Sequence, residues 1–150
     1  MIVSIASDHA GFEQKQQLVE SLKDEGYQVV DQGPQSDDRV DYPDFAVLVA
    51  MDVASGRADR GVLVCGTGVG MALAADKVAG VRAANIINEQ FAELCRQHNN
   101  ANVITLSGRF VSFEENKRIL SAFLTTEFEG GRHADRVAKI DALDSRGAGK

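Results

Sequence analysis

The chain has 150 residues, the length of one ordinary domain, and a chain of this length buries enough surface for a hydrophobic core without disulfides. Hydrophobic residues make up 44% and charged residues 25%, which excludes a disordered or coiled-coil chain. The 22 acidic residues outnumber the 16 basic ones and give a net charge of −6, so nucleic acid is not expected as a partner. We expect a single domain over residues 1–150 whose last residues, 144–150, form a loose tail.

The few cysteines and histidines argue against a disulfide-bonded framework and against a zinc site. Cys65 and Cys95 do not belong to a CxxC pair and do not form a disulfide framework, and the three histidines are too scattered for a zinc set. Met1 leads into an apolar run without a basic segment, and no apolar stretch approaches the roughly 18 residues of a membrane span. We therefore expect a cytoplasmic protein with no membrane partner, no bound metal and no cofactor.

Short β-branched runs alternate with longer helical patterns along the chain. The pattern predicts strands at 2–6, 27–30, 61–65, 82–87 and 102–106. It predicts helices at 12–25, from about 45 to 56, from the glycine turn to about 79, from about 88 to 98, 112–126 and 134–143. This alternation is typical of the α/β class, with a mostly parallel five-stranded sheet covered by helices on both faces.

Three polar turns follow predicted strands. They are Ser7-Asp8-His9 after the first, Cys65-Gly66-Thr67-Gly68 after the third and Ser107-Gly108-Arg109 after the fifth. In parallel α/β sheets, ligands bind outside the carboxyl ends of the strands. We expect these three turns to meet at one edge of the sheet.

The glycine turn GTGVG at residues 66–70 joins a strand to a helix, and its free backbone N–H groups could hold an anion. Met71 stands where a dinucleotide-binding loop has its third glycine and where the loop of a thiol phosphatase has its arginine. A Walker A loop is disfavoured because Met-Ala follows the glycines instead of Lys-Ser/Thr. A tight turn without any ligand remains the alternative.

Cys65 heads this turn. A thiol between a strand and the start of a helix feels the positive end of the helix dipole, which favours the thiolate and suits a base or nucleophile. The alternative is an apolar cysteine that ends the buried strand. Cys95 lies in the middle of a predicted helix and is interpreted as part of the core.

Three further polar clusters have a structural and a functional interpretation. His98-Asn99-Asn100-Ala101-Asn102 is either a helix C-cap or a group of ligand-binding side chains, and Asp8-His9 is either a helix N-cap or part of a site. Arg132 and Arg136 are spaced to share one helix face, where they could clamp a phosphate or simply be solvated. Arg109 is a third candidate for phosphate binding.

Six short stretches in collinear order between residues 7 and 136 form a specific pattern. They are SDHAG (7–11), DYPD (41–44), CGTGVGM (65–71), GVRAA (80–84), HNNAN (98–102) and FEGGRH (128–133). By this pattern the sequence strongly resembles the type B ribose-5-phosphate isomerases and their galactose-6-phosphate isomerase relatives. The likeness covers nearly the whole chain.

The resemblance implies a Rossmann-like, three-layer α/β/α sandwich and a homodimer or tetramer with shared active sites. It implies a metal-free aldose–ketose isomerase that interconverts ribose 5-phosphate and ribulose 5-phosphate through an enediolate. Cys65 would be the base and His98 the acid that opens the sugar ring. Thr67 and the backbone of Gly66, Gly68, Val69 and Gly70 would hold the enediolate oxygen. The sugar hydroxyls and the phosphate would be held by Asp8, His9, Asn99, Arg109, Arg132 and Arg136.

Pro34, Asp76 and Ser107 depart from the family pattern and leave the substrate open. An allose, galactose or erythrulose phosphate is one alternative, and a non-catalytic sugar-phosphate- or nucleotide-binding module is another. Some relatives use a Glu in the helix after the glycine turn as base, but this chain has no Glu between Glu25 and Glu89. The presence of both Cys65 and His98 favours catalysis, because a binding module needs neither.

Overall fold

Five strands form one sheet in the order β2-β1-β3-β5-β4, and every neighbouring pair is parallel. The structure is a computed structural model that describes residues 1–146. Parallel neighbours require crossover connections, which explains why helices alternate with strands along the chain. The strands are β1 (Ile2–Ser7), β2 (Gln28–Asp31), β3 (Arg60–Cys65), β4 (Ala83–Asn85) and β5 (Val103–Ser107).

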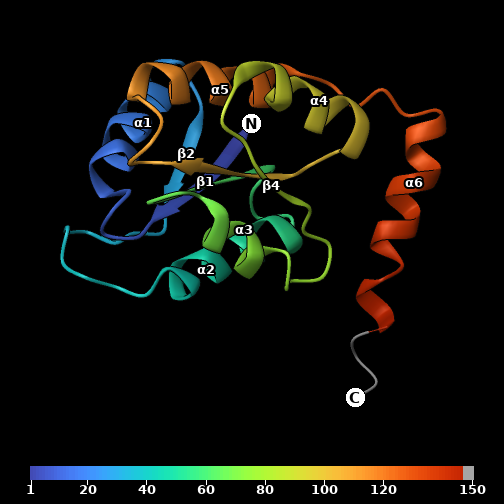
Figure 1. Cartoon of the computed structure of the whole chain (residues 1–150), viewed down its shortest axis with the longest axis horizontal. Helices are drawn as coiled ribbons and strands as arrows, with labels where there is room; N and C mark the ends of the chain where they lie inside the picture. Colours follow the sequence, from blue (N-terminus) through green and yellow to red (C-terminus); the bar gives the residue numbers. More distant parts are fainter. Residues whose placement is uncertain (147–150) are drawn as a thin grey trace.

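Helices cover both faces of this sheet. Figure 1 shows α1, α4 and α5 on one face and α2 and α3 on the other, so the predicted three-layer α/β/α sandwich is confirmed. The helices are α1 (Phe12–Asp24), α2 (Tyr42–Ala54), α3 (Val69–Ala75), α4 (Glu89–Asn99), α5 (Phe113–Thr125) and α6 (Arg132–Asp141), followed by a 3₁₀ turn, η1 (Asp144–Arg146).

Each face of the sheet carries its own hydrophobic core, because successive strand residues point to opposite faces. Val62 of β3 faces the core under α1, α4 and α5, together with Leu18 and Phe123. Leu63, the next residue, faces the core under α2 and α3, together with Met71. Both faces of β3 are buried, which accounts for its continuous apolar sequence.

Most element boundaries shift by one or two residues from the sequence prediction, and α2, α3 and β4 show the clearest differences. Helix α2 begins at Tyr42, because Pro43 is tolerated in the first turn of a helix, where its missing N–H has no intrahelical acceptor. Helix α3 ends at Ala75, and β4 is only three residues long. Asp76 Oδ1 accepts a hydrogen bond from the N–H of Ala83 at 2.7 Å, which turns the chain directly into this short strand.

Helix α6 lies beside the sandwich, next to the end of α4 (Figure 1). Of the predicted loose tail, residues 144–146 form the turn η1, and Asp144 accepts a hydrogen bond from the N–H of Gly80 at 2.7 Å. Residues 147–150 lie outside the described residues. Within residues 1–146, none of the helices has the length and apolar character needed to cross a membrane, and the cytoplasmic location stays a prediction.

Candidate active site

The three polar turns meet at the carboxyl edge of the sheet, as predicted. Cys65 of β3 pairs with Ser107 of β5, and the N–H of Gly108 donates a hydrogen bond to the carbonyl of Cys65 at 2.8 Å. On the other side of β3, the N–H of Asp8 donates to the carbonyl of Val64 at 3.1 Å. The chain proceeds from β1 to β2 in one direction and to β3 in the other, so this edge lies at the switch point where α/β folds bind ligands.

Cys65 is buried, and its thiol has a specific partner. The Sγ atom accepts a hydrogen bond from the backbone N–H of Gly68 at 3.1 Å. Gly68 has a φ of +84°, and a Cβ at this position would lie 2.1 Å from Nδ2 of Asn85, so no larger residue fits without displacement. Since α3 has only seven residues, the polar contact to the sulfur comes from the backbone of the turn itself and not from a long helix.

The rest of the glycine turn leaves polar groups facing outward. Thr67 is exposed, and its Oγ1 accepts a hydrogen bond from the N–H of Val69 at 3.3 Å, so the hydroxyl proton is free to bind a ligand oxygen. A Cβ on Gly70 would lie 2.7 Å from the ring of Tyr42, which therefore packs directly on the turn. No role was predicted for Tyr42, although it belongs to the DYPD stretch of the family pattern.

Arg109 and the Asp8-His9 pair complete this edge. The Nη1 atom of Arg109 lies 3.5 Å from where a Cβ of Gly66 would be, so the guanidinium lies over the glycine turn. Asp8 Oδ1 accepts the N–H of Gly11 at 3.0 Å, so its carboxylate fixes the turn before α1. The N-cap of α1 is Gly11, which carries no side-chain cap, so the N-cap interpretation of Asp8-His9 is wrong. The carboxyl-edge cluster consists of Asp8, His9, Cys65, Gly66, Thr67, Gly68, Val69, Gly70 and Arg109.

The structure does not bring the remaining predicted residues to this edge within one chain. His98 and Asn99 end α4, which precedes the amino end of β5. The carbonyl of Asn102 accepts the N–H of Gly61 near the start of β3. Cys65 lies four residues farther along β3, a span of about 13 Å. The α4–α6 cluster, made of His98, Asn99, Arg132 and Arg136, is therefore separate from the carboxyl-edge cluster of the same chain.

His98 stacks on His133 of α6, with ring centroids 4.4 Å apart and planes inclined by 10°. His133 is buried, and its pKa is lowered mainly by burial and further by the neighbouring His98 and Arg132. Arg132 and Arg136 are exposed and one turn apart on α6, so both are available to an anion. Sequence spacing could not reveal the stack because it joins two helices that are far apart in the chain.

Comparison with known proteins identifies the family. Residues 3–140 match the family model described as Ribose/Galactose Isomerase. The chain belongs to this family. Ribose-5-phosphate isomerase B of Escherichia coli is 44% identical over 96% of this chain and 97% of that protein. A probable ribose-5-phosphate isomerase B of Mycoplasma genitalium is 51% identical over 92% of each.

Solved structures of ribose-5-phosphate isomerases B share the fold throughout. The Clostridium thermocellum protein superposes with a TM-score of 0.96 at 44% identity, covering 97% of this chain and 99% of that one. The Mycoplasma genitalium protein, solved with bound ribulose-5-phosphate, superposes with a TM-score of 0.93 at 49% identity, covering 96% of each chain. The resemblance inferred from the six sequence stretches is thereby confirmed.

Within this family member, only part of the HNNAN segment is available to a ligand. Asn100 has a φ of +48° and ends α4, as the C-cap interpretation expects. The buried Arg96 donates from Nη1 to Asn100 Oδ1 at 2.9 Å and to the carbonyl of Ala101 at 2.5 Å, and burial lowers its pKa to about 10. Asn102 is hydrogen-bonded to residues 80 and 82. His98 and Asn99 remain at the surface.

One group of side chains has the composition of a metal site. His98, Glu129 and His133 offer ligand atoms that lie within 4.8 Å of one another. A metal binds imidazole in the plane of the ring at about 2.0–2.1 Å, and two stacked, nearly parallel rings direct their lone pairs side by side. The observed ring geometry therefore does not converge on one ion.

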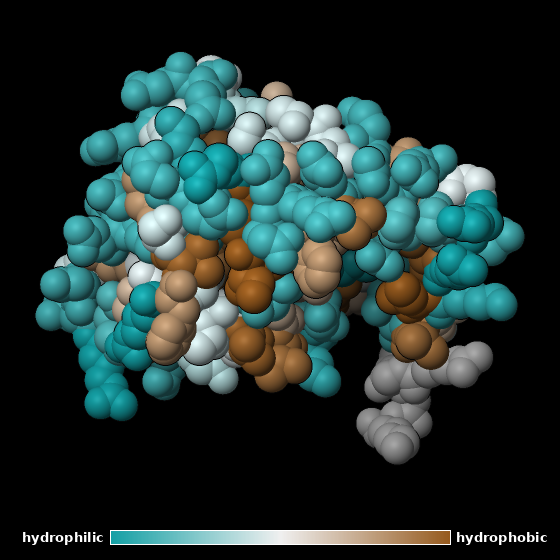
Figure 2. All heavy atoms as spheres, turned by 45° about the horizontal axis from the view of Figure 1, so that its top comes forward, coloured by the Kyte–Doolittle hydropathy of each residue, from teal (hydrophilic) through white to brown (hydrophobic). Residues whose placement is uncertain are grey.

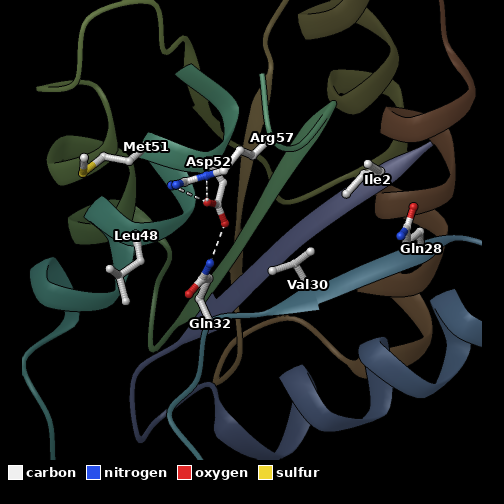
Figure 3. Close-up of a pocket in the computed structure, with 8 residues that line it drawn as sticks. All are labelled: Ile2, Gln28, Val30, Gln32, Leu48, Met51, Asp52 and Arg57. Carbon is white, nitrogen blue, oxygen red and sulfur yellow. Dashed lines mark hydrogen bonds and ion pairs between the residues drawn. The ribbon is translucent and has the colours of Figure 1, made fainter. Parts of the chain in front are cut away.

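A cavity of about 670 Å³ lies between α2 and the strands β1 and β2 (Figure 3), and none of its lining residues belongs to either cluster. Asp52 accepts hydrogen bonds there from Gln32 at 2.6 Å and from Arg57 at 2.9 Å. The cavity contains neither a thiol nor an imidazole. Its lining residues are Ile2, Gln28, Val30, Gln32, Leu48, Met51, Asp52 and Arg57.

Proposed function

We propose that this chain is an aldose–ketose isomerase that interconverts ribose 5-phosphate and ribulose 5-phosphate. The observation that carries the proposal is the thiol of Cys65, which is held by the N–H of Gly68 in a turn whose Gly66 lies next to the guanidinium of Arg109. This arrangement combines a base, anion-binding N–H groups and a cation at one edge. The names of the relatives, and the ribulose-5-phosphate bound to one of them at 49% identity, support the same substrate.

Cys65 is the proposed base. Its thiolate removes the proton from C2 of the open-chain aldose, the electron pair shifts toward the carbonyl oxygen on C1, and an enediolate forms. Within the enediolate the proton of the C2 hydroxyl passes to the C1 oxygen. The thiol returns the other proton to C1, which leaves the carbonyl at C2 and the ketose as product. Proton transfer by a positioned side chain contributes about 10²–10⁴-fold to such reactions.

The glycine turn is the proposed oxyanion site. The developing charge on the C1 oxygen requires donors that are already in place. The hydroxyl of Thr67 is suited to this, and so are the backbone N–H groups of residues 66–70 other than those of Gly68 and Val69, which donate to Cys65 Sγ and Thr67 Oγ1. The close packing of Tyr42 on Gly70 restricts the turn to one conformation. The same donors can therefore act in both directions of the reaction.

His98 is the proposed acid that protonates the ring oxygen when the furanose opens. Imidazole is suited to this role because it changes charge near neutral pH. Within one chain His98 belongs to the α4–α6 cluster, so it would serve the Cys65 of another subunit. We infer a homodimer or tetramer in which each active site combines the carboxyl-edge cluster of one chain with the α4–α6 cluster of a second.

Exposed apolar side chains support such an assembly. Leu73 of α3 is 63% exposed and Phe91 of α4 is 55% exposed, and large apolar side chains that gather into an exposed patch mark contact surfaces. Figure 2 shows hydrophobic side chains in the lower centre of one face and again on α6 near its C-terminal end. Further exposed apolar residues are Val69, Ile87, Phe110, Ile140 and Leu143.

The phosphate must be bound against the overall charge of −6. Arg109 from one chain and Arg132 and Arg136 from the other would supply a local cationic pocket. Asp8, His9 and Asn99 would hold the sugar hydroxyls. No step of this scheme requires a metal or a cofactor, because the base, the acid and the oxyanion donors are all groups of the chain.

The test is an activity assay with a panel of phosphorylated pentoses, hexoses and tetroses, before and after treatment of the enzyme with EDTA. The panel includes ribose, galactose, allose and erythrulose phosphates. We expect the highest kcat/KM with ribose 5-phosphate and no loss of activity after EDTA treatment. A higher kcat/KM for another sugar phosphate would show that this sugar phosphate, and not ribose 5-phosphate, is the preferred substrate. Thermal protection by phosphosugars or nucleotides without any turnover would show a binding module instead.

A further inference from the structure

Two side chains that have no role in the reaction scheme hold the loop that carries Arg109, residues 107–111. One comes from α1 and the other from α5. Gln14 of α1 donates from Nε2 to the carbonyls of Gly108 at 3.1 Å and Val111 at 2.8 Å. Asn116 of α5 donates from Nδ2 to the carbonyl of Ser107 at 2.8 Å. Three of the five backbone carbonyls in loop 107–111 therefore accept a hydrogen bond from a side-chain amide.

The two amides are also bonded to each other. Asn116 Nδ2 donates to Gln14 Oε1 at 2.7 Å, so both N–H groups of each side-chain amide have acceptors. Asn116 is fully buried, and Gln14 is half-buried. A hydrogen-bonded network in such surroundings is stronger than at the surface and restricts the loop to one conformation.

The loop transmits this restraint to the glycine turn. Ser107 Oγ donates to the carbonyl of Gly66 at 2.8 Å and accepts the N–H of Phe110 at 3.0 Å. The N–H of Arg109 donates to the same Gly66 carbonyl at 3.2 Å. The backbone of Arg109 is thus fixed on both sides, which leaves its exposed side chain only rotamer freedom over the turn.

We propose that Gln14 and Asn116 are positioning residues, which hold loop 107–111 so that Arg109 meets the anionic end of a bound phosphosugar. They act through Arg109 and do not touch the substrate. The inference rests on the proposed function, because it assigns Arg109 to the phosphate. Loss of the amide donors therefore weakens substrate binding and leaves the proton-transfer step at Cys65 largely unchanged.

The test compares Gln14→Met with Gln17→Met. Methionine matches the length of glutamine but has no N–H donor, and Gln17 is an exposed residue of the same helix. We expect Gln14→Met to raise KM about 5- to 20-fold with kcat changed less than about threefold, because misplacing a binding group costs ground-state and transition-state binding alike. Gln17→Met should change neither constant.

A second comparison places both substitutions in an Arg109→Ala background. If Gln14 acts through Arg109, Gln14→Met should change KM little further in the Arg109→Ala background. A general structural defect would raise KM there by the same factor as in the wild type. An equal effect in both backgrounds, or no difference between Gln14→Met and Gln17→Met, overturns the inference. Asn116→Leu is expected to act like Gln14→Met, and the Gln14 pair alone decides if Asn116→Leu does not fold.

Failure of the proposed function is distinguished by titrating ribose 5-phosphate calorimetrically into the same variants. If the wild type binds this sugar phosphate without converting it, the isomerase proposal fails, and the Kd of Gln14→Met still tests the positioning role. If the wild type neither binds nor converts it, both proposals are overturned. A Kd of Gln14→Met equal to that of the wild type overturns the positioning role alone.

Discussion

The Sγ atom of Cys65 accepts a hydrogen bond from the N–H of Gly68 at 3.1 Å. A backbone donor directed at sulfur stabilises the thiolate and fixes the direction from which the sulfur meets a substrate. This relationship distinguishes Cys65 from Cys95, whose Sγ instead donates to the carbonyl of Ala92 within its own helix at 3.2 Å.

Replacing Cys65 by alanine should remove turnover and keep binding. The thiol is proposed to act on the substrate proton, so kcat should fall by at least about 10²–10⁴-fold, the usual contribution of a positioned base, and Kd for ribose 5-phosphate should stay within about tenfold. Steady-state kinetics and calorimetric titration of the same preparation measure both. Retained turnover would show that another group is the base.

Alkylation should separate the two cysteines. Both are similarly buried, at 5% and 6% exposure, but burial raises the pKa of the Cys95 thiol to about 11. Iodoacetamide reacts with thiolates, so near neutral pH we expect Cys65 to be modified first, and activity to be lost in parallel. Mass spectrometry of peptides from timed samples locates the label.

The matched control for this experiment is Cys65→Ser, in which Cys95 is the only thiol. This variant should take up little label over the period that modifies the wild type. Rapid labelling of Cys95 in either protein would contradict the assignment.

Much of this site could be predicted from local sequence. The strand-to-helix turns, the glycine pattern and the spacing of Arg132 and Arg136 are short-range features, and the structure places them as expected. The amide pair Gln14–Asn116 spans 102 residues and the stack of His98 on His133 joins separate helices, so neither leaves a local pattern. The start of β4 likewise depends on a contact that strand propensity does not reveal, because the N–H of Ala83 donates to the side chain of Asp76.

Gly68→Ala should destabilise the protein and inactivate it. An L-residue at a φ of +84° is strained, and the added Cβ would lie 2.1 Å from Asn85 Nδ2. We expect the free energy of unfolding to fall by about 2–4 kcal/mol, measured by urea denaturation. Displacement of the backbone at residue 68 would also break the hydrogen bond from its N–H to Cys65 Sγ, so kcat of the folded protein should fall.

Gly56→Ala is the control for Gly68→Ala. Gly56 has a similar φ of +76°, but no atom lies within 4 Å of its would-be Cβ. This variant should lose only about 1–2 kcal/mol from backbone strain and should keep full activity. Equal losses in the free energy of unfolding would mean that the side chain of Asn85 moves away from the new Cβ without any loss of stability.

Stability should depend on pH through His133. Its pKa is lowered in the folded protein, chiefly by burial and next by His98, so the unfolded chain takes up a proton at a higher pH than the folded one. The unfolded state therefore binds more protons below about pH 6.5, and the free energy of unfolding falls as the pH drops from that value. Above it this contribution is constant.

Urea denaturation of the wild type and His133→Gln between about pH 8 and about pH 5 isolates this contribution. The wild type should lose more stability than the variant over the acidic part of the range. A wild type that loses no more than the variant would show that His133 is protonated equally easily in both states.

Subunit mixing should show that active sites are shared. The carboxyl-edge cluster lies at the carboxyl end of β3, whereas the segment after α4 joins the sheet near the amino end of β3, about 13 Å away along the strand. Cys65→Ala and His98→Asn therefore damage different halves of a composite site. Each variant alone should be inactive. A hybrid dimer should contain one intact site, made of Cys65 from one chain and His98 from the other.

Differently tagged variants are denatured together, refolded, and assayed. Random pairing makes half of the dimers hybrid with one intact site of two, so we expect about a quarter of wild-type activity. The control pairs Cys65→Ala with Arg109→Ala, which damage the same cluster and cannot rebuild a site, so its activity should not exceed that of Arg109→Ala alone. If the Cys65→Ala and His98→Asn mixture stays inactive although hybrids are isolated by their two tags, each chain must complete its own site, and His98 is not the acid that meets Cys65.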